Sequence, residues 1–174
     1  MQLQDAIKLI NHSSLSKKNN ANWADLGCGN GLFTYALANI LTLGSSIYAA
    51  DKASPLLQSL PNPKQISIRT QTLDFIKDPL PYHQLDGIMM ANSLHYVADK
   101  PAFLQKAKQT LGETGAFLIV EYDTTKSNQW VPYPINNKNL EALFAEHGYH
   151  NYTLLGQMPS VFRAGNIYAA LIKP

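Results

Sequence analysis

The stretch from Trp23 to Gly31, WADLGCGNG, constrains the fold of this 174-residue chain more than any other segment. A short apolar run ends in Asp25, and glycines at positions 27, 29 and 31 follow before a helical pattern begins near Leu32. Glycine accepts positive φ and has no Cβ, so alternate glycines let backbone N–H groups approach a ligand closely. The following helix directs its positive end to the same place. The segment predicts a strand–turn–helix unit with a ligand site at the carboxyl end of the strand, the alternative being a turn that serves packing alone.

Strand and helix patterns alternate along the rest of the chain. Helical spacing predicts helices at about residues 3–10, 31–42, 53–59, 100–110 and 137–147. Apolar runs predict strands at Trp23–Leu26, Ser46–Ala50, Gln65–Thr70, Leu85–Ala91, Ala116–Tyr122, Tyr149–Leu155 and Asn166–Ile172. This alternation is typical of a parallel sheet with helices on both faces.

The last two predicted strands differ from the others in their connection. Only about ten residues join them, too few for a helical crossover, so we expect an antiparallel hairpin. Asp99 is a suitable N-cap with Pro101 in the first turn of the helix that follows it, and Gly148 is a suitable end for the helix before the hairpin. The predicted fold class is α/β, a three-layer αβα sandwich with a mostly parallel sheet of about seven strands and a C-terminal antiparallel hairpin.

Composition excludes several classes of protein. Hydrophobic residues make up 45% of the chain, which disfavours disorder, and fourteen Lys and Arg against twelve Asp and Glu give a net charge of +2 without a basic stripe. Binding to a large nucleic acid is therefore disfavoured. No apolar run reaches the roughly 20 residues of a membrane span, and the polar N-terminus does not resemble a signal peptide. With Cys28 as the single cysteine, a cytoplasmic protein is expected.

The arrangement of the glycines distinguishes between nucleotide-type ligands. The dinucleotide fingerprint needs Gly or Ala where this chain has Leu32, and no Gly-Lys-Ser/Thr follows as in a P-loop. The segment Asp25–Gly31, DLGCGNG, resembles the signature of class I S-adenosylmethionine-dependent methyltransferases, in particular the small-molecule type 11 and type 25 groups. The resemblance implies a Rossmann-like fold, S-adenosyl-L-methionine as cofactor, and methyl transfer to a small organic acceptor by in-line displacement.

The resemblance also implies a set of cofactor-binding residues. No metal is expected, because the sequence shows no clustered carboxylates that could bind a divalent ion. An acidic residue at the end of the second strand would hold the ribose hydroxyls, and one after the third strand would contact the adenine amino group. The end of the fourth strand would lie near the methionine moiety, and the first aspartate near its ammonium group. The residues that match are Asp25, Gly27, Cys28, Gly29, Gly31, Asp51, Lys52, Asp74, Phe75, Ala91 and Asn92.

Several of these residues also allow a structural interpretation. Asp51 and Asp74 could be turn or helix caps, since aspartate is common at such positions. Cys28 lies among glycines with no basic partner in its neighbourhood to activate the thiol, so we interpret it as a small filler and not as a nucleophile.

His95, just beyond the fourth strand, is the predicted catalytic base, the alternative being a hydrogen-bonded wall of the pocket. Glu121 and Asp123, at the end of the fifth strand, are the second choice. The loop 123–136 contains Trp130 and Tyr133 between prolines, which suits either an acceptor platform or simple hydrophobic anchoring. His147 and His150 lie on either side of a helix end, which makes a metal pair improbable.

The organisation predicted from these features is a single domain, 1–174. Residues 1–20 form an N-terminal helix and linker, 21–122 the cofactor-binding half, and 123–174 a substrate-side loop, helix and hairpin. Two other functions stay open: a non-catalytic S-adenosylmethionine-binding module or partner subunit, and, less favoured, an NAD(P)-dependent oxidoreductase. A homodimer or a complex with a partner subunit also stays open. The expected partner of the enzyme is a small methyl acceptor, with no membrane involved.

Overall fold

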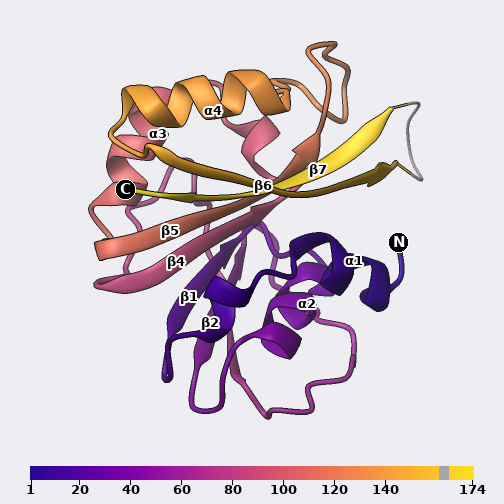
Figure 1. Ribbon diagram of the computed structural model, residues 1–174, viewed down its shortest axis with the longest axis vertical. Coiled ribbons are helices and arrows are strands. Elements are labelled where there is room, and N and C mark those ends of the chain that lie inside the picture. The colour runs from indigo at the N-terminus through magenta and orange to yellow at the C-terminus, as the bar shows by residue number, and fades with distance from the viewer. Residues whose placement is uncertain (161–164) are drawn as a thin grey trace.

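The sheet that these patterns predict is present in the computed structural model, which describes residues 1–160 and 165–174. Seven strands run in the spatial order β3-β2-β1-β4-β5-β7-β6 (Figure 1). Strands β1 to β5 pair in parallel, whereas β7 is antiparallel to both β5 and β6. The strands are β1 Asn22–Leu26, β2 Ser46–Asp51, β3 Ser67–Thr72, β4 Leu85–Ala91, β5 Leu111–Tyr122, β6 Asn151–Pro159 and β7 Asn166–Lys173. The predicted fold class is confirmed.

Helices cover both faces of this sheet. Helices α1 (Leu3–Ile10) and α2 (Leu32–Ile40) lie on one face, and α3 (Lys100–Lys108) and α4 (Asn137–Glu146) lie on the other (Figure 1). Short 3-10 helices occur at Ser13–Ser16 (η1) and Leu94–Tyr96 (η2). No helix in the described ranges is both long and apolar enough to cross a membrane.

The alternation of side chains along β5 divides the core into two clusters. Phe117 and Ile119 pack towards α3 and α4, whereas Leu118 and Val120 pack towards α1 and α2. All four side chains are fully buried. This period-two pattern, with apolar residues on both faces, is what a central strand between two helical layers requires.

The helix boundaries follow the capping signals. Asp99 accepts a hydrogen bond from the backbone N–H of Ala102 (3.0 Å), as expected for an N-cap, and Pro101 lies in the first turn of α3. Gly148 has φ +85°, the left-handed conformation in which glycine commonly ends a helix. Both predictions are confirmed.

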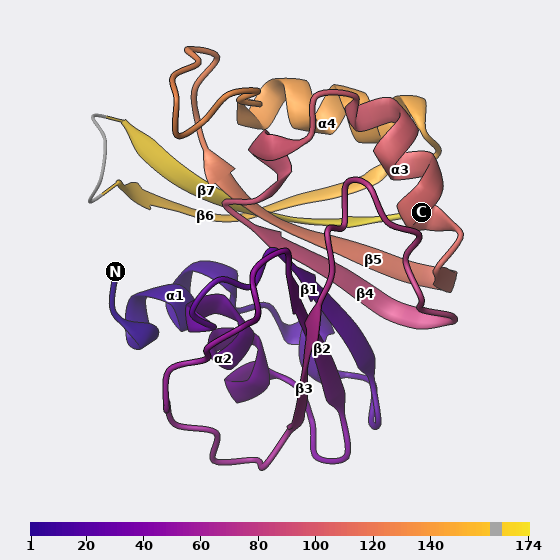
Figure 2. The same cartoon turned by 180° about the vertical axis from the view of Figure 1, so that it is seen from behind.

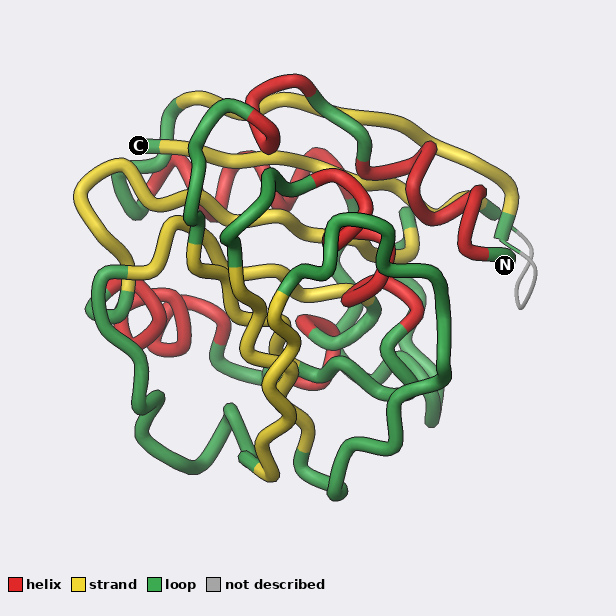
Figure 3. The backbone as a smooth tube through the Cα atoms, turned by 90° about the horizontal axis from the view of Figure 1, so that it is seen from below, coloured by secondary structure: helices red, strands yellow, loops and turns green. Residues whose placement is uncertain are grey.

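One predicted helix, at residues 53–59, is wrong. The connection 52–66 between β2 and β3 is a long loop, and Figures 2 and 3 show that no helix interrupts it. Pro55 and two further prolines at 61 and 63 prevent a continuous helical ladder. The loop is instead fixed from outside: Gln58 N–H donates to the carbonyl of Asn30 (3.0 Å), and the Lys64 ammonium donates to the carbonyl of Leu41 at the end of α2 (2.7 Å).

Smaller differences concern segment ends. β5 begins at Leu111 and not at Ala116, β6 runs from Asn151 to Pro159 instead of 149–155, and the predicted linker 12–20 contains η1.

The pairing of β1 with β4 depends on a small residue. Trp23 lies opposite Gly87 in the register, and a Cβ added to Gly87 would lie 2.3 Å from the Trp23 ring. The absence of a side chain at Gly87 therefore lets the buried indole lie across β4.

Candidate active site

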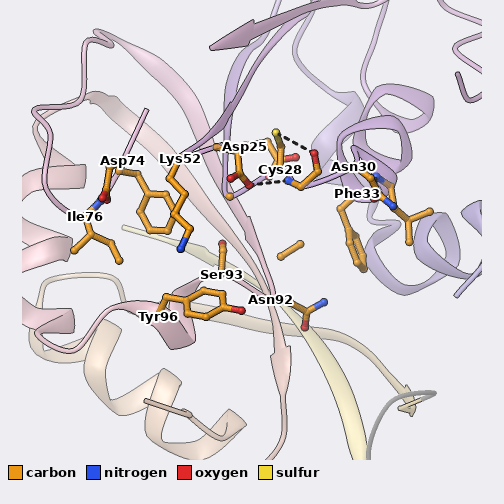
Figure 4. Close-up of a pocket in the computed structure, with 16 residues that line it drawn as sticks. Asp25, Cys28, Asn30, Phe33, Lys52, Asp74, Ile76, Asn92, Ser93 and Tyr96 are labelled. Carbon is orange, nitrogen blue, oxygen red and sulfur yellow. Dashed lines mark hydrogen bonds between the residues drawn. The ribbon is translucent and has the colours of Figure 1, made fainter. Parts of the chain in front are cut away.

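A cavity of about 470 Å³ opens at the carboxyl ends of the parallel strands. Its walls come from the glycine turn after β1, the ends of β2 and β4, and the loop after β3 (Figure 4). Ten of the predicted cofactor residues line this first cavity: Asp25, Gly27, Cys28, Gly29, Asp51, Lys52, Asp74, Phe75, Ala91 and Asn92. The topology thus brings together residues up to 67 positions apart in the sequence.

The glycine turn is fixed by bonds to the neighbouring strand. The N–H groups of Gly27 and Cys28 both donate to the carbonyl of Ala50 (2.8 and 3.0 Å), which joins the turn to the end of β2. Gly29 has φ +54°, and a Cβ added there would meet nothing within 4 Å, so the space above it is free for a ligand. Gly31 does not line the cavity: with φ +87° it is the N-cap of α2, packed against Leu57.

Asp25 is the most buried acidic group of the cavity, 1% exposed. Its Oδ2 accepts a hydrogen bond from the Thr34 hydroxyl (2.6 Å). Burial raises the pKa of Asp25 to about 7, the Thr34 bond opposes this, and the negative charge of Asp51 adds to it. Among the described residues, no cation opposes this rise in the pKa of Asp25.

In residues 1–160 and 165–174, only two buried side-chain atoms lack a hydrogen-bond partner, Asp25 Oδ1 and Asn92 Oδ1. Both residues line the first cavity. Buried polar atoms are rarely unpaired, because each costs about 1–3 kcal/mol. Two such atoms in one cavity therefore indicate a ligand whose donor groups form hydrogen bonds with them.

Asp51 connects the glycine turn to the chain that follows β2. Its Oδ2 accepts from Gly29 N–H (3.0 Å) and its Oδ1 from Ala53 N–H (3.1 Å), so the carboxylate is oriented and retains lone pairs for a ligand. The neighbouring Lys52 extends across the cavity, and its ammonium lies 5.9 Å from the centre of the Tyr96 ring on the opposite wall (Figure 4).

Asp74 is a turn cap and also lies in the wall of the first cavity. Its Oδ1 accepts from the N–H groups of Ile76 and Lys77 (3.1 and 3.3 Å), which makes it a turn cap, and it also lines the cavity. Phe75 is 7% exposed and packs edge-on against Phe103, so most of its ring belongs to the core.

Burial raises the pKa of the Cys28 thiol to about 12, with Asp25 and Asp51 adding to the effect. A thiol that stays protonated at neutral pH is a poor nucleophile, in agreement with its interpretation as a filler.

His95 lies outside the first cavity and lines a second one of about 460 Å³. Its Nδ1 is 2.7 Å from Glu121 Oε2, and its backbone N–H donates to Glu121 Oε1 (3.0 Å). Both side chains are almost fully buried, at 3% and 1% exposure. The two cavities share Asn92 and Tyr96 in their walls, so they adjoin.

Sequence reasoning missed some of the residues that line the first cavity, namely Asn30, Leu32, Phe33, Ile76, Ser93 and Tyr96. Asn30, Leu32 and Phe33 follow directly from the glycine turn and could have been inferred from it. Ser93 carries no signal of its own, although its hydroxyl donates to the carbonyl of Leu26 (2.6 Å) and fixes the chain beside β1. In the described part of the chain, no group of three His, Cys, Asp or Glu side chains is placed to hold a metal ion.

A family comparison agrees with this geometry. The model of the methyltransferase domain family matches residues 24–119, just over half of the 174-residue chain, including the end of β1, the glycine turn and β2 to β4. The chain belongs to this family. Its members take their methyl group from S-adenosylmethionine, as the glycine turn predicts. No curated protein matches the methyltransferase chain.

Solved structures share the fold of this methyltransferase at low sequence identity. The 1,6-didemethyltoxoflavin N1-methyltransferase of Burkholderia thailandensis, solved with bound 1,6-didemethyltoxoflavin and S-adenosylhomocysteine, has a TM-score of 0.69 at 16% identity, over 98% of this chain and 77% of that one. An Aquifex aeolicus S-adenosylmethionine-dependent methyltransferase has a TM-score of 0.61 at 15% identity, over 99% and 98%. A candidate O-methyltransferase from Nostoc punctiforme has a TM-score of 0.67 at 16% identity, over 99% of this chain but only 55% of that one.

The residues of the first cavity fit the methyl donor of this family. S-adenosylmethionine carries an ammonium group, which suits the unpaired buried carboxylate oxygen of Asp25. It carries two vicinal ribose hydroxyls, which suit the oriented carboxylate of Asp51. The open space above Gly29 accommodates a ligand close to the backbone.

Proposed function

We propose that this methyltransferase moves a methyl group to a small organic acceptor by in-line displacement, with the methyl donor in the first cavity and the acceptor in the second. The observation that carries the proposal is the adjacency of the two cavities, which share Asn92 and Tyr96. A nucleophile in one and a sulfonium methyl group in the other can then meet in line. Such alignment supplies roughly 7–11 kcal/mol of the barrier in well-oriented systems, more than a base does.

The proposal assigns a role to each end of the first cavity. Asp25 binds the ammonium group of the methyl donor, and Asp51 binds the ribose hydroxyls. Asp74 accepts from the adenine amino group through Oδ2, since its Oδ1 already caps a turn. When bound, S-adenosylmethionine supplies the activated methyl carbon and a leaving group that carries no net charge after transfer.

His95 acts in this proposal as the general base, and Glu121 positions it. The Glu121 carboxylate beside Nδ1 favours the imidazole tautomer with its proton on Nδ1, which leaves the lone pair on Nε2. The second bond of Glu121, to the backbone N–H of His95, fixes the main chain as well. A positioned base contributes typically 10²–10⁴-fold to the rate.

Titration with S-adenosylhomocysteine in a calorimeter tests the proposed function first, and no binding at millimolar concentration would end it. A screen for methyl transfer to small acceptors follows. Cofactor binding without turnover of any acceptor would favour the non-catalytic module or partner subunit. A thermal shift produced by NAD and not by S-adenosylhomocysteine would favour the oxidoreductase.

The role of His95 has its own test. His95→Gln should lower kcat by at least 100-fold and leave the affinity for S-adenosylhomocysteine unchanged, because the ring lies outside the first cavity. Glu121→Gln, which keeps the shape but removes the charge, should shift the pH profile of kcat without changing cofactor affinity. Undiminished turnover by His95→Gln would remove it as the base.

The cytoplasm is the compartment that this proposal assumes. The support is the free thiol of Cys28 in the cavity wall, since reduced cysteines are usual there.

A further inference from the structure

The surface of the second cavity is mostly aromatic. Tyr96, Tyr122 and Trp130 line it together with the ring of His95. The remaining lining residues are Val131 and the amides Asn92 and Asn128, so none of the described residues that line the cavity is an Asp, Glu, Lys or Arg. A cavity with aromatic walls and no acidic or strongly basic side chain suits a flat, uncharged ligand, because ring faces stack on ring faces.

The loop that carries part of the aromatic wall is held in place by hydrogen bonds, each of which has a backbone atom at one end. Asn128 Oδ1 accepts from the N–H groups of Trp130 and Val131, both at 2.9 Å, which closes a tight turn. The N–H of Tyr133 donates to the carbonyl of His95 (3.0 Å), and the Lys100 ammonium donates to the carbonyls of Val97 and Tyr133 (2.9 and 2.7 Å). The loop after β5 is therefore fastened to η2, and the backbone that carries Trp130 is held beside the cavity.

Trp130 is exposed to an unusual degree for such a residue. Its side chain is 70% exposed although it lines the cavity and the loop that carries it is well anchored. A large exposed aromatic residue at the mouth of a cavity marks a surface that a ligand covers. The anchoring of the loop does not require this side chain, since Trp130 takes part in the hydrogen bonds above only through its backbone N–H.

His95, which lines this cavity, restricts the chemistry of the acceptor. Nδ1 of His95 is engaged by Glu121, and among the described residues no partner takes Nε2. An imidazole accepts a proton readily from a phenol-like hydroxyl, whose pKa is roughly 10, and far less readily from an aliphatic alcohol, whose pKa is close to that of water, roughly 16. A base of this kind therefore suits an acceptor whose O–H or ring N–H is made acidic by an aromatic system.

We infer that the acceptor is a flat, uncharged aromatic or heteroaromatic compound that bears a weakly acidic O–H or ring N–H, an inference that rests on the proposed function. The ring stacks on the aromatic wall and its O–H or N–H faces His95. The proton moves to Nε2, the lone pair on the acceptor atom forms the bond to the methyl carbon, and the carbon–sulfur bond breaks with its electron pair left on sulfur. The products are the methylated acceptor, S-adenosylhomocysteine and a protonated His95 beside the Glu121 carboxylate.

The test compares 2-naphthol with 2-decalol, its saturated counterpart, which has the same carbon skeleton but is neither flat nor acidic. Binding to the protein saturated with S-adenosylhomocysteine is measured by calorimetry, so no turnover is needed. We expect 2-naphthol to bind at least tenfold more tightly than 2-decalol. Equal affinity for the two compounds, or no binding of 2-naphthol, would overturn the inference.

Two variants locate the binding. Trp130→Ala should weaken 2-naphthol about tenfold and leave S-adenosylhomocysteine affinity within twofold, whereas Tyr133→Ala, an exposed aromatic of the same loop outside the cavity wall, should change neither. Unchanged 2-naphthol affinity in Trp130→Ala would contradict the placement. The two possible failures are distinguishable. A protein that does not bind S-adenosylhomocysteine refutes the proposed function, and one that binds it but prefers 2-decalol refutes only the acceptor class.

Discussion

Asp25 allows the sharpest test of the cofactor site, because its carboxylate is costly in the empty protein. Burial raises its pKa from 3.8 to about 7, so the folded state holds a proton that the unfolded state has already lost between these values. The unfolded state then binds fewer protons than the folded state, and the free energy of unfolding falls as the pH rises through that range. Three units of pKa correspond to about 4 kcal/mol, reached at and above about pH 7.

Asp25→Asn removes this pH-dependent cost. The Asn side chain still accepts from the Thr34 hydroxyl, and any penalty of its amide is independent of pH. The free energy of unfolding of the variant minus that of the wild type should therefore increase by up to about 4 kcal/mol from pH 4 to pH 8. Below about pH 3 the difference should be constant, because Asp25 is then protonated in both the folded and the unfolded state.

Urea unfolding of both proteins at pH 4, 5, 6, 7 and 8 measures this difference. Thr34→Val serves as a second variant: it removes the hydrogen bond that lowers the pKa of Asp25, so the pH dependence should extend to higher pH. S-adenosylhomocysteine affinity should be lost in Asp25→Asn, and in the wild type it should rise with pH through about 7 as the carboxylate ionises. A stability difference that does not vary with pH would refute the argument.

Three further changes have defined outcomes. Gly29→Asn should abolish S-adenosylhomocysteine binding in a folded protein, because Asn tolerates the left-handed conformation but fills the open space, whereas Gly148→Asn, with similar backbone demands far from the cavity, should bind normally in calorimetry. Asp51→Ala should weaken S-adenosylhomocysteine by about 1.5–3 kcal/mol in the same assay, the scale of hydrogen bonds to a charged group, and a negligible loss would move the ribose contact elsewhere. Gly87→Ala should lower the unfolding free energy by about 1–3 kcal/mol in urea, since the new methyl group collides with Trp23, and an unchanged midpoint would contradict that packing.

The fold was predictable because its signals are local. These signals depend on interactions between residues that are close in sequence. They are the apolar strands between helical patterns, the short link before the last strand, and the capping residues Asp99 and Gly148. The predicted helix at 53–59 failed for a related reason. Its apolar spacing is compatible with a helix, but Pro55 lies within it and prolines at 61 and 63 stop its continuation. Contacts with Asn30 and the end of α2 stabilise the extended path instead.

The site was predictable to the extent that it lies on strand ends. Parallel strands place their carboxyl ends at one edge, so Asp25, Asp51 and the residues after β4 were expected together, and they line one cavity. Gly31 is an exception to this reasoning, because it is the N-cap of α2 and does not line the cavity. The aromatic loop was recognised by composition, but only the hydrogen bonds of Asn128 and Lys100 decide that it forms a fixed wall.

The pairing of His95 with Glu121 could not be read from the sequence, because it depends on a reversal of the chain. β4 and β5 are in parallel register with Ala91 opposite Val120, which brings Asn92 level with Glu121. Asn92 then adopts φ +54°, a left-handed conformation that turns the chain into η2 and returns His95 over the end of β5. The same residue contributes an unpaired amide oxygen to the first cavity and lines the second. One strained turn therefore positions the proposed base and also borders both cavities, so the proposed alignment of methyl donor and acceptor depends on the conformation of a single asparagine.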